Sequence, residues 1–268
     1  MNKAVKYRLY PTTEQKIMFA KTFGCCRKVY NLMLADKIAC DKNRKRQNGF
    51  PKFKLSKHSR KSYTTNNQKG TVDIIDGRYI KLPKIGKIKA VIHRKPDADW
   101  IIKSATISQD SDGKFYASVL FEFATTITTV AISDNVIGLD YKSDGLYMDS
   151  NGYCPSGHKY YRQNQEKLAN AQKKLKHKTV GSNNYKKQQR KIAKIQKHTS
   201  NQRLDFLHKE STKIANLYDI VCVETLNMKA MSNKGFGNGK ATMDNGYGMF
   251  LNMLGYKLAD RGKYFVKV

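Results

Sequence analysis

The sequence has few acidic residues, although it is rich in charge. It carries 21 Asp and Glu against 51 Lys and Arg in 268 residues, which gives a net charge of +30. Each phosphate that a cation neutralises releases condensed counterions, so this excess favours nucleic acid as a partner over an anionic membrane surface. The first residues contain no apolar signal region, and no apolar run approaches the ~20 residues of a spanning helix. We therefore expect no membrane partner and a cytoplasmic, intracellular protein.

Paired cysteines and phosphate-binding motifs are also missing. The five cysteines are odd in number and form no Cys-x-x-Cys pair, which argues against a disulfide framework and makes zinc an unexpected cofactor. The six histidines lack metal-ligand spacing. The glycine-rich stretch "KGFGNGKAT" has Lys234 where a phosphate loop needs glycine, and Ala241 where it needs Ser or Thr. This stretch is expected to be a loop.

Hydrophobic periodicity predicts an α+β fold in two domains. The first domain, residues 1–130, opens with an alternating strand, "KAVKYRLYP", and further alternating strands follow between residues 72 and 124. Together these strands predict a small antiparallel β-barrel with a helical element at about residues 12–70. A capping box of Thr12 and Gln15 opens the helix. Its apolar residues at spacings of three and four predict a core-facing stripe formed by Phe19, Phe23, Cys26, Tyr30 and Met33.

A basic stretch with interspersed aromatic residues lies between residues 41 and 70. Aromatic rings among cations suit base stacking and contact with a phosphate backbone, although a solvated loop is the alternative. The nucleic-acid-binding residues predicted here are Lys52, Phe53, Lys54, Arg60, Lys61 and Tyr63.

The second domain, residues 131–268, opens with a strand at 135–141 and a hairpin closed by residues 150–152. A helical hairpin at about residues 159–217 then turns near Gly181. Its apolar stripe is narrow and its basic face is wide, which favours phosphate contact over a merely solvated helix. The residues predicted to make that contact are Lys173, Lys174, Lys187, Arg190, Lys191 and Lys194.

Two carboxylates each follow an apolar run. Asp140 ends "VIGLD" and Glu224 ends "DIVCVE", a run typical of a buried parallel strand. If these strands are neighbours, both acids lie at the carboxyl edge of the sheet, where a cation between them would relieve their repulsion. Mg²⁺ is the usual cation, and paired Mg²⁺ ions support phosphodiester cleavage. The alternative is that both acids are ordinary residues of turns.

Motifs along most of the chain carry a resemblance to one family. In order they include "KYRLYPTTEQ", "FGCCRKVYN", "FPKFK", "GLDY", "DIVCVETLNMKAM" and "DNGYGMFLNMLGYK". The chain resembles the transposon-encoded TnpB (OrfB) family of RNA-guided DNA nucleases, which are related to type V CRISPR effectors. The resemblance implies a wedge-type, OB-like barrel and a RuvC-like domain of the RNase H fold. It implies that Asp140 and Glu224 are catalytic, metal-binding acids, with guide RNA and a DNA target as partners.

The sequence also departs from the family pattern. The family's zinc ribbon and third catalytic Asp are expected beyond the strand matching "KYFVKV", and its recognition insertion is replaced by a short basic stretch at residues 40–48. We therefore expect a truncated, catalytically impaired, transposition-associated endonuclease whose RuvC-like domain is incomplete. The alternatives are a non-catalytic guide-RNA- or DNA-binding protein or repressor, and a decayed gene product.

Overall fold

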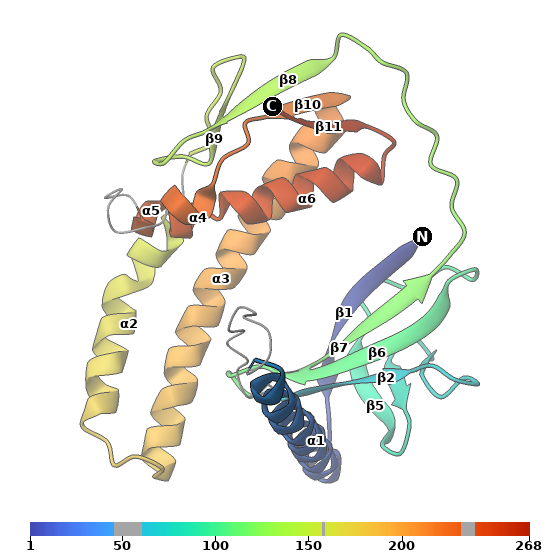
Figure 1. Cartoon of the computed structure of the whole chain (residues 1–268), viewed down its shortest axis with the longest axis vertical. Coiled ribbons are helices and arrows are strands. Elements are labelled where there is room, and N and C mark those ends of the chain that lie inside the picture. The colour runs from blue at the N-terminus through green and yellow to red at the C-terminus, as the bar shows by residue number, and fades with distance from the viewer. Residues whose placement is uncertain (46–60, 157–158, 232–238) are drawn as a thin grey trace. The chain divides into compact units, whose positions relative to one another are not determined.

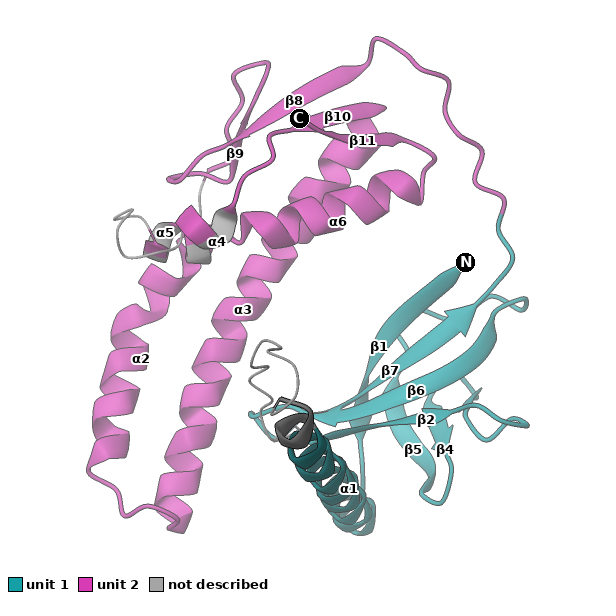
Figure 2. Cartoon of the chain, in the orientation of Figure 1, with its two compact units in different colours: residues 1–125 teal, residues 126–268 magenta. Residues whose placement is uncertain are grey.

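The computed structural model describes residues 1–45, 61–156, 159–231 and 239–268. The predicted contacts Lys52, Phe53, Lys54 and Arg60 lie outside these residues, as does most of the glycine-rich stretch. The chain forms two compact units, residues 1–125 and residues 126–268 (Figure 2). Within the described ranges, no helix is long and apolar enough to cross a membrane.

Unit 1 is built on a seven-stranded antiparallel sheet (Figure 1). The strands are β1 (Asn2–Tyr10), β2 (Ser62–Asn66), β3 (Asp73–Ile75), β4 (Tyr79–Leu82), β5 (Gly86–Val91), β6 (Ile101–Gln109) and β7 (Phe115–Glu122). Their order is β2-β6-β7-β1-β5-β4-β3, so β2 and β3 are the two edges. The antiparallel sheet was predicted correctly. It curls into an open half-barrel, however, because its two edge strands do not pair with each other in the described part of the chain.

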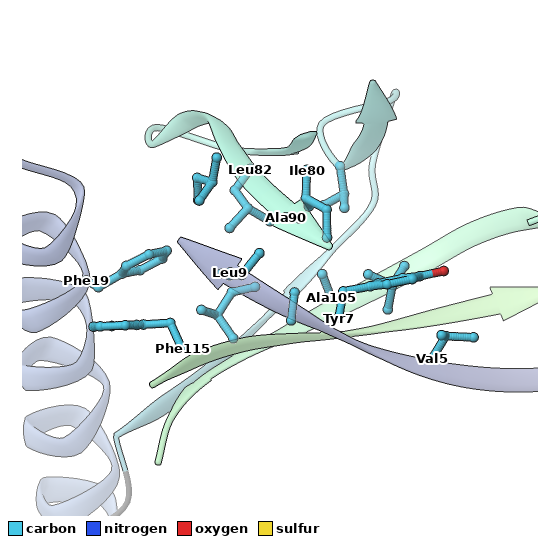
Figure 3. Close-up of a cluster of buried hydrophobic side chains, with 14 of the residues drawn as sticks. Val5, Tyr7, Leu9, Phe19, Ile80, Leu82, Ala90, Ala105 and Phe115 are labelled. Carbon is cyan, nitrogen blue, oxygen red and sulfur yellow. The ribbon is translucent and has the colours of Figure 1, made fainter. Parts of the chain in front are cut away.

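Alternation along the strands places the core of unit 1. In β7 the buried side chains are Phe115, Ala117, Val119 and Phe121, at the two-residue spacing of a strand with one buried face. Helix α1 (Thr13–Lys45) covers this core with Phe19, whose ring stacks on Phe115 with centroids 5.4 Å apart (Figure 3). The capping box is present, because the Thr12 amide donates to Gln15 Oε1 at 3.0 Å and the Gln15 amide donates to Thr12 Oγ1 at 3.3 Å.

The predicted core stripe of α1 is only partly correct. Phe19 and Phe23 are 0% and 2% exposed and lie against Tyr63 of β2. Cys26 is exposed, and so are Tyr30 at 44% and Met33 at 66%. These three residues were wrongly assigned to the core, because the buried core that α1 shares with the sheet includes Phe19 and Phe23 but not these three.

Unit 2 contains a four-stranded sheet of order β11-β10-β8-β9. Its strands are β8 (Val136–Tyr141), β9 (Tyr147–Asp149), β10 (Ile220–Val223) and β11 (Tyr264–Lys267). Strands β8, β10 and β11 are parallel, and β9 is antiparallel to β8. The helices are α2 (Tyr160–Lys176), α3 (Asn183–Leu217), α4 (Met228–Met231), α5 (Gly239–Asn245) and α6 (Tyr247–Ala259). Helices α3 and α6 share one core with the sheet, which includes Leu207, Ile214, Phe250 and Leu254.

Helices α2 and α3 form the predicted antiparallel hairpin (Figure 1). Gly181 makes the turn at φ +83°, and Ser182 caps α3 by accepting from the Tyr185 amide at 3.1 Å. The predicted turn at residues 150–152 is present, because the Gly152 amide donates to the Asp149 carbonyl at 3.0 Å and the Asp149 amide donates to the Tyr153 carbonyl at 2.9 Å. Residues 142–146 join β8 to β9, and the turn at 150–152 follows β9.

Candidate carboxylate site and basic surfaces

The register of β8 and β10 brings Asp140 and Glu224 side by side. Gly138 pairs with Cys222 and Leu139 pairs with Val223, so the next residue of each chain segment is one of the two acids. Neighbouring strands run ~4.8 Å apart, which sets the backbone separation at this level. The sequence could place each acid at the end of a strand. The matched register is what the structure adds.

Both acids face away from the core. Leu139 and Val223 are 3% and 1% exposed because they point toward α3 and α6. Side chains alternate along a strand, so Asp140 and Glu224 point to the opposite, open face, and both are exposed. Both carboxylates are therefore accessible to a ligand on that face of the sheet.

An open hollow of about 470 Å³ contains this pair. Asp140, Glu224, Gly138 and Cys222 line it together with Met148 and Ser150. Gly138 has no side chain beyond hydrogen and Cys222 has a small one, so little side-chain bulk stands beside the acids. The hollow is thus a shallow site on a sheet face, open enough to admit an extended ligand.

Asp149 is a third acid of this hollow that the sequence interpretation missed. One of its oxygens, Oδ1, accepts from the amides of Asn151 and Tyr153 at 3.0 and 2.8 Å. The motif "DSNG" is typical of a turn, and the Asp149 side chain stabilises that turn. The sequence therefore contained no signal that this acid would share a hollow with Asp140.

Tyr247, the first residue of α6, is a second residue that was missed. Its ring is fully buried between Tyr141 and Phe250, with centroid distances of 5.1 and 6.0 Å. Burial raises the pKa of its phenol to about 12, and the negative charges of Asp140 and Glu224 add to the shift. The Tyr247 phenol is thus within electrostatic reach of both acids.

The donor set suits a hard cation. Carboxylate oxygens are preferred ligands of Mg²⁺, which commonly takes one or two carboxylates and completes its shell with water and phosphate oxygens. Asp140 and Glu224 fit that incomplete protein shell. Among the described residues, no group of three His, Cys, Asp or Glu is placed to hold a metal.

The predicted basic residues of the helical hairpin lie on α2 and α3 within about three turns of the loop that joins the two helices. The Gln188 side chain of α3 donates to the Ala171 carbonyl of α2 at 2.8 Å, which fixes how the two helices align. The basic tip, as we call this surface, consists of Lys173, Lys174, Lys187, Arg190, Lys191 and Lys194, all exposed. None of the six has an acidic partner within the described part of the chain. Such uncompensated charge suits phosphate contact.

Lys61 and Tyr63 are the predicted contacts of the basic stretch that the structure describes. Lys61 is exposed just before β2. Tyr63 is half-buried, with ring centroids 6.3 Å from Phe19 and 5.9 Å from Phe23, and burial raises its pKa to about 12. Its ring packs against α1, so base stacking at Tyr63 stays a prediction.

Comparison with known proteins identifies the family. A family described as "Probable transposase" (OrfB type) matches residues 118–234. One described as "Helix-turn-helix domain" matches residues 1–45, where the structure has β1 followed by the single long helix α1.

Two curated relatives carry related names. A "Putative RNA-guided DNA endonuclease" of Streptomyces pristinaespiralis is 26% identical over all of this chain and 77% of its own length. The "Putative RNA-guided DNA endonuclease InsQ" of Escherichia coli (strain K12) is 30% identical over 68% of this chain. The chain spans only 48% of that second relative.

A solved structure shares the fold. The protein of a Cas12f1–sgRNA–target DNA complex, solved by cryo-EM, aligns with 100% of this chain and 89% of its own, with a TM-score of 0.54 and 11% identity. At that identity the likeness concerns the fold alone. The two OrfB family matches and the curated relatives, without this structure, place the chain in the TnpB (OrfB) family.

Proposed function

We propose that this protein binds a guide RNA and a DNA target, and that it acts as a Mg²⁺-dependent DNA endonuclease at Asp140 and Glu224. The single observation that carries the proposal is the matched register of these two acids on the open face of a parallel sheet. The names of the curated relatives support the RNA-guided activity. The parallel arrangement of β8, β10 and β11 supports a RuvC-like, RNase H-type assignment for unit 2, and the curled sheet supports a wedge-type assignment for unit 1.

Each part of unit 2 has a role in this proposal. Asp140 and Glu224 hold the cation, which when bound would stabilise the attacking and leaving oxygens of a phosphodiester. The basic tip binds RNA phosphates, since its six cations have no acidic partner among the described residues. The hollow around the acids is open enough for a nucleic-acid strand to lie along the sheet face. The target DNA sequence is recognised by base pairing with the guide RNA, as in other guided nucleases.

A second candidate function is binding without cleavage. Asp149 lines the same hollow, but among the described residues no three His, Cys, Asp or Glu are placed to hold a metal together, so Asp140 and Glu224 would hold Mg²⁺ weakly. A protein that binds guide RNA and DNA but cuts slowly or not at all could act as a repressor or stabilise the RNA. The exposed basic tip supports this function as well as the first.

The test begins with the RNA that copurifies with the full chain. That RNA is sequenced, and a plasmid carrying the matching target is incubated with the complex and Mg²⁺. We expect weak cleavage that Asp140→Asn abolishes. Asp134→Asn serves as the matched control, because Asp134 is exposed just before β8 and outside the hollow.

The outcomes separate the two candidates. Cleavage that survives Asp140→Asn would refute the carboxylate site. Copurified RNA with no cleavage would favour the binding protein, and purification without any discrete RNA would contradict both functions.

A further inference from the structure

Unit 1 contains a cleft whose lining combines cations with apolar rings. It lies between α1 and the adjoining ends of β6 and β7 and has a volume of about 310 Å³. Lys16, Arg27 and Lys61 contribute the charge, and Ala20, Phe23 and Phe115 contribute the apolar part. We call it the α1 cleft. Its volume is at the small end of the range for ligand pockets.

The charge of the α1 cleft is of one sign. Lys16 and Arg27 belong to α1, and Lys61 directly precedes β2. The Lys61 carbonyl accepts from the Gln109 amide at 2.9 Å. No acid lines the cleft, and none of the three cations has an acidic partner in the ranges that the structure describes. Three cations around one small volume repel one another, and a bound phosphate would relieve that repulsion.

The apolar part of the cleft is made of stacked rings. Phe19 lies beside Phe115 in the core (Figure 3), with the two rings 25° from parallel, and Phe23 stacks on Phe19 at 12°. Phe23 and Phe115 are only 2% and 5% exposed, so they form a rigid base to the cleft. Ala20 is exposed on the same side of α1, and its small side chain leaves room above them.

This combination matches the two halves of a nucleotide. A planar base can pack on an apolar floor and Ala20, while its phosphate contacts cations at the rim. Gln109 also lines the cleft, and its amide can donate to or accept from a base edge. A base that packs on this floor cannot at the same time stack on a neighbouring base on that side, so the nucleotide is unstacked there.

We propose that the α1 cleft receives one unstacked nucleotide of a single-stranded RNA or DNA, with its base against Phe23, Phe115 and Ala20 and its phosphate among Lys16, Arg27 and Lys61. The proposal rests on the proposed function only in that the protein binds nucleic acid. It does not depend on Asp140, Glu224 or a metal ion.

The test uses short single-stranded oligonucleotides, one of RNA and one of DNA, each with a photoreactive thio-substituted base. Affinity for the full chain is measured by fluorescence anisotropy over a range of salt concentrations. Ala20→Trp fills the cleft without changing its charge, and we expect it to weaken binding about fivefold or more while leaving the salt dependence unchanged. Ala35→Trp, on an exposed part of α1 outside the cleft, is its matched control and should bind as wild type does.

Charge is tested separately. Lys16→Ala should lower the slope of log affinity against log salt by about 0.7, the value for one phosphate contact on a single strand. Lys21→Ala, also exposed on α1 but outside the cleft, should not lower it. Photocrosslinks should map to peptides that contain Phe23 or Phe115, and the oligonucleotide that responds to Ala20→Trp identifies RNA or DNA as the ligand.

The proposal of a nucleotide site is overturned if Ala20→Trp and Ala35→Trp bind alike, or if the crosslinks map outside the cleft. Nucleic-acid binding by the protein would still stand in that case. If wild type binds neither oligonucleotide, the cleft proposal is refuted, while the proposed function is decided separately by whether a discrete RNA copurifies with the chain.

Discussion

Lys257 allows a quantitative test of the packing of unit 2. Its side chain is 8% exposed between α6 and α3. The ammonium donates to the His208 carbonyl at 2.7 Å, to Ser211 Oγ at 2.8 Å and to Thr212 Oγ1 at 2.7 Å. These bonds use all three of its protons, yet none of the acceptors is charged. A buried cation without an acid partner should therefore reduce the free energy of unfolding.

The pKa of Lys257 gives the size of this effect. Burial lowers it to about 8, and the positive charge of Arg261 adds to the shift. An unfolded lysine has a pKa of about 10.4, so between pH 8 and 10.4 the unfolded state binds the proton and the folded state does not. Stability attributable to this residue therefore rises with pH across that window. A difference of about 2.4 pKa units corresponds to about 3 kcal/mol.

Lys257→Met removes the charge and leaves no polar partner stranded. Ser211 Oγ still donates to the Leu207 carbonyl at 2.6 Å, and Thr212 Oγ1 still donates to the His208 carbonyl at 2.7 Å. We expect the variant to be at least as stable as wild type at pH 7. Its advantage should fall by about 3 kcal/mol by pH 10.5, as wild type loses the proton.

The assay is urea unfolding of both proteins at pH 7 and pH 10.5, followed by circular dichroism at a helical wavelength. Helices α2, α3 and α6 all belong to unit 2 and contribute much of that signal. Lys209→Met is the control, since Lys209 is exposed on α3 and pairs with Asp205 in an i,i+4 ion pair at 2.7 Å. Pairs of this kind contribute only about 0.3–0.5 kcal/mol. A Lys257→Met effect that is the same at both pH values would refute the reasoning.

Two further predictions concern the strand edges of unit 2. The Lys263 ammonium lies 3.1 Å from the Asp219 carboxylate and also donates to the carbonyls of Ala215 and Tyr218. The hydrogen bond from Lys263 to Asp219 is the main cause that lowers the pKa of Asp219. This pair stabilises the fold fully above the ordinary pKa of Asp, and that stability is lost as the pH falls through the lowered pKa of Asp219. Lys263→Met should therefore make stability depend less on pH in acid unfolding followed by circular dichroism. A variant whose stability falls with acid as steeply as that of wild type would contradict this role. Gly262 has φ +68°, and an added Cβ would meet the Thr128 carbonyl. Gly262→Ala should therefore lower the free energy of unfolding, measured in urea, by about 2–3 kcal/mol. A variant as stable as wild type would count against this geometry.

Local patterns predicted much of the fold because they depend on neighbouring residues alone. The Thr12–Gln15 capping box and the hairpin turn at Gly181 are set by short-range chemistry, and both are present. The curled but open sheet of unit 1 could not be predicted in this way. Whether β2 and β3 pair depends on contacts between distant segments, which alternation along a single strand does not encode.

The apolar stripe of α1 shows the same limit. Helical spacing correctly indicated that Phe19, Phe23, Tyr30 and Met33 share one side of the helix. It could not indicate how far along the helix the sheet would extend. The structure buries the first two residues and exposes the other two.

The candidate site was predictable in its residue types but not in its geometry. Asp140 and Glu224 could be singled out because each follows an apolar strand, whereas their matched register depends on how β8 pairs with β10. Tyr247 gave no local signal at all. It reaches the neighbourhood of the acids only because α6 packs under the same sheet.

Helix α3 sets a fixed distance within unit 2. Leu207 is buried in the core beneath the sheet, while Lys191 belongs to the basic tip on the same uninterrupted helix. Sixteen residues at a rise of 1.5 Å separate the two positions by ~24 Å. That length equals about seven nucleotides of a strand that rises 3.4 Å per residue. Under the proposed function, the number of helical residues between the core and the tip determines how far from the carboxylate pair the RNA is held.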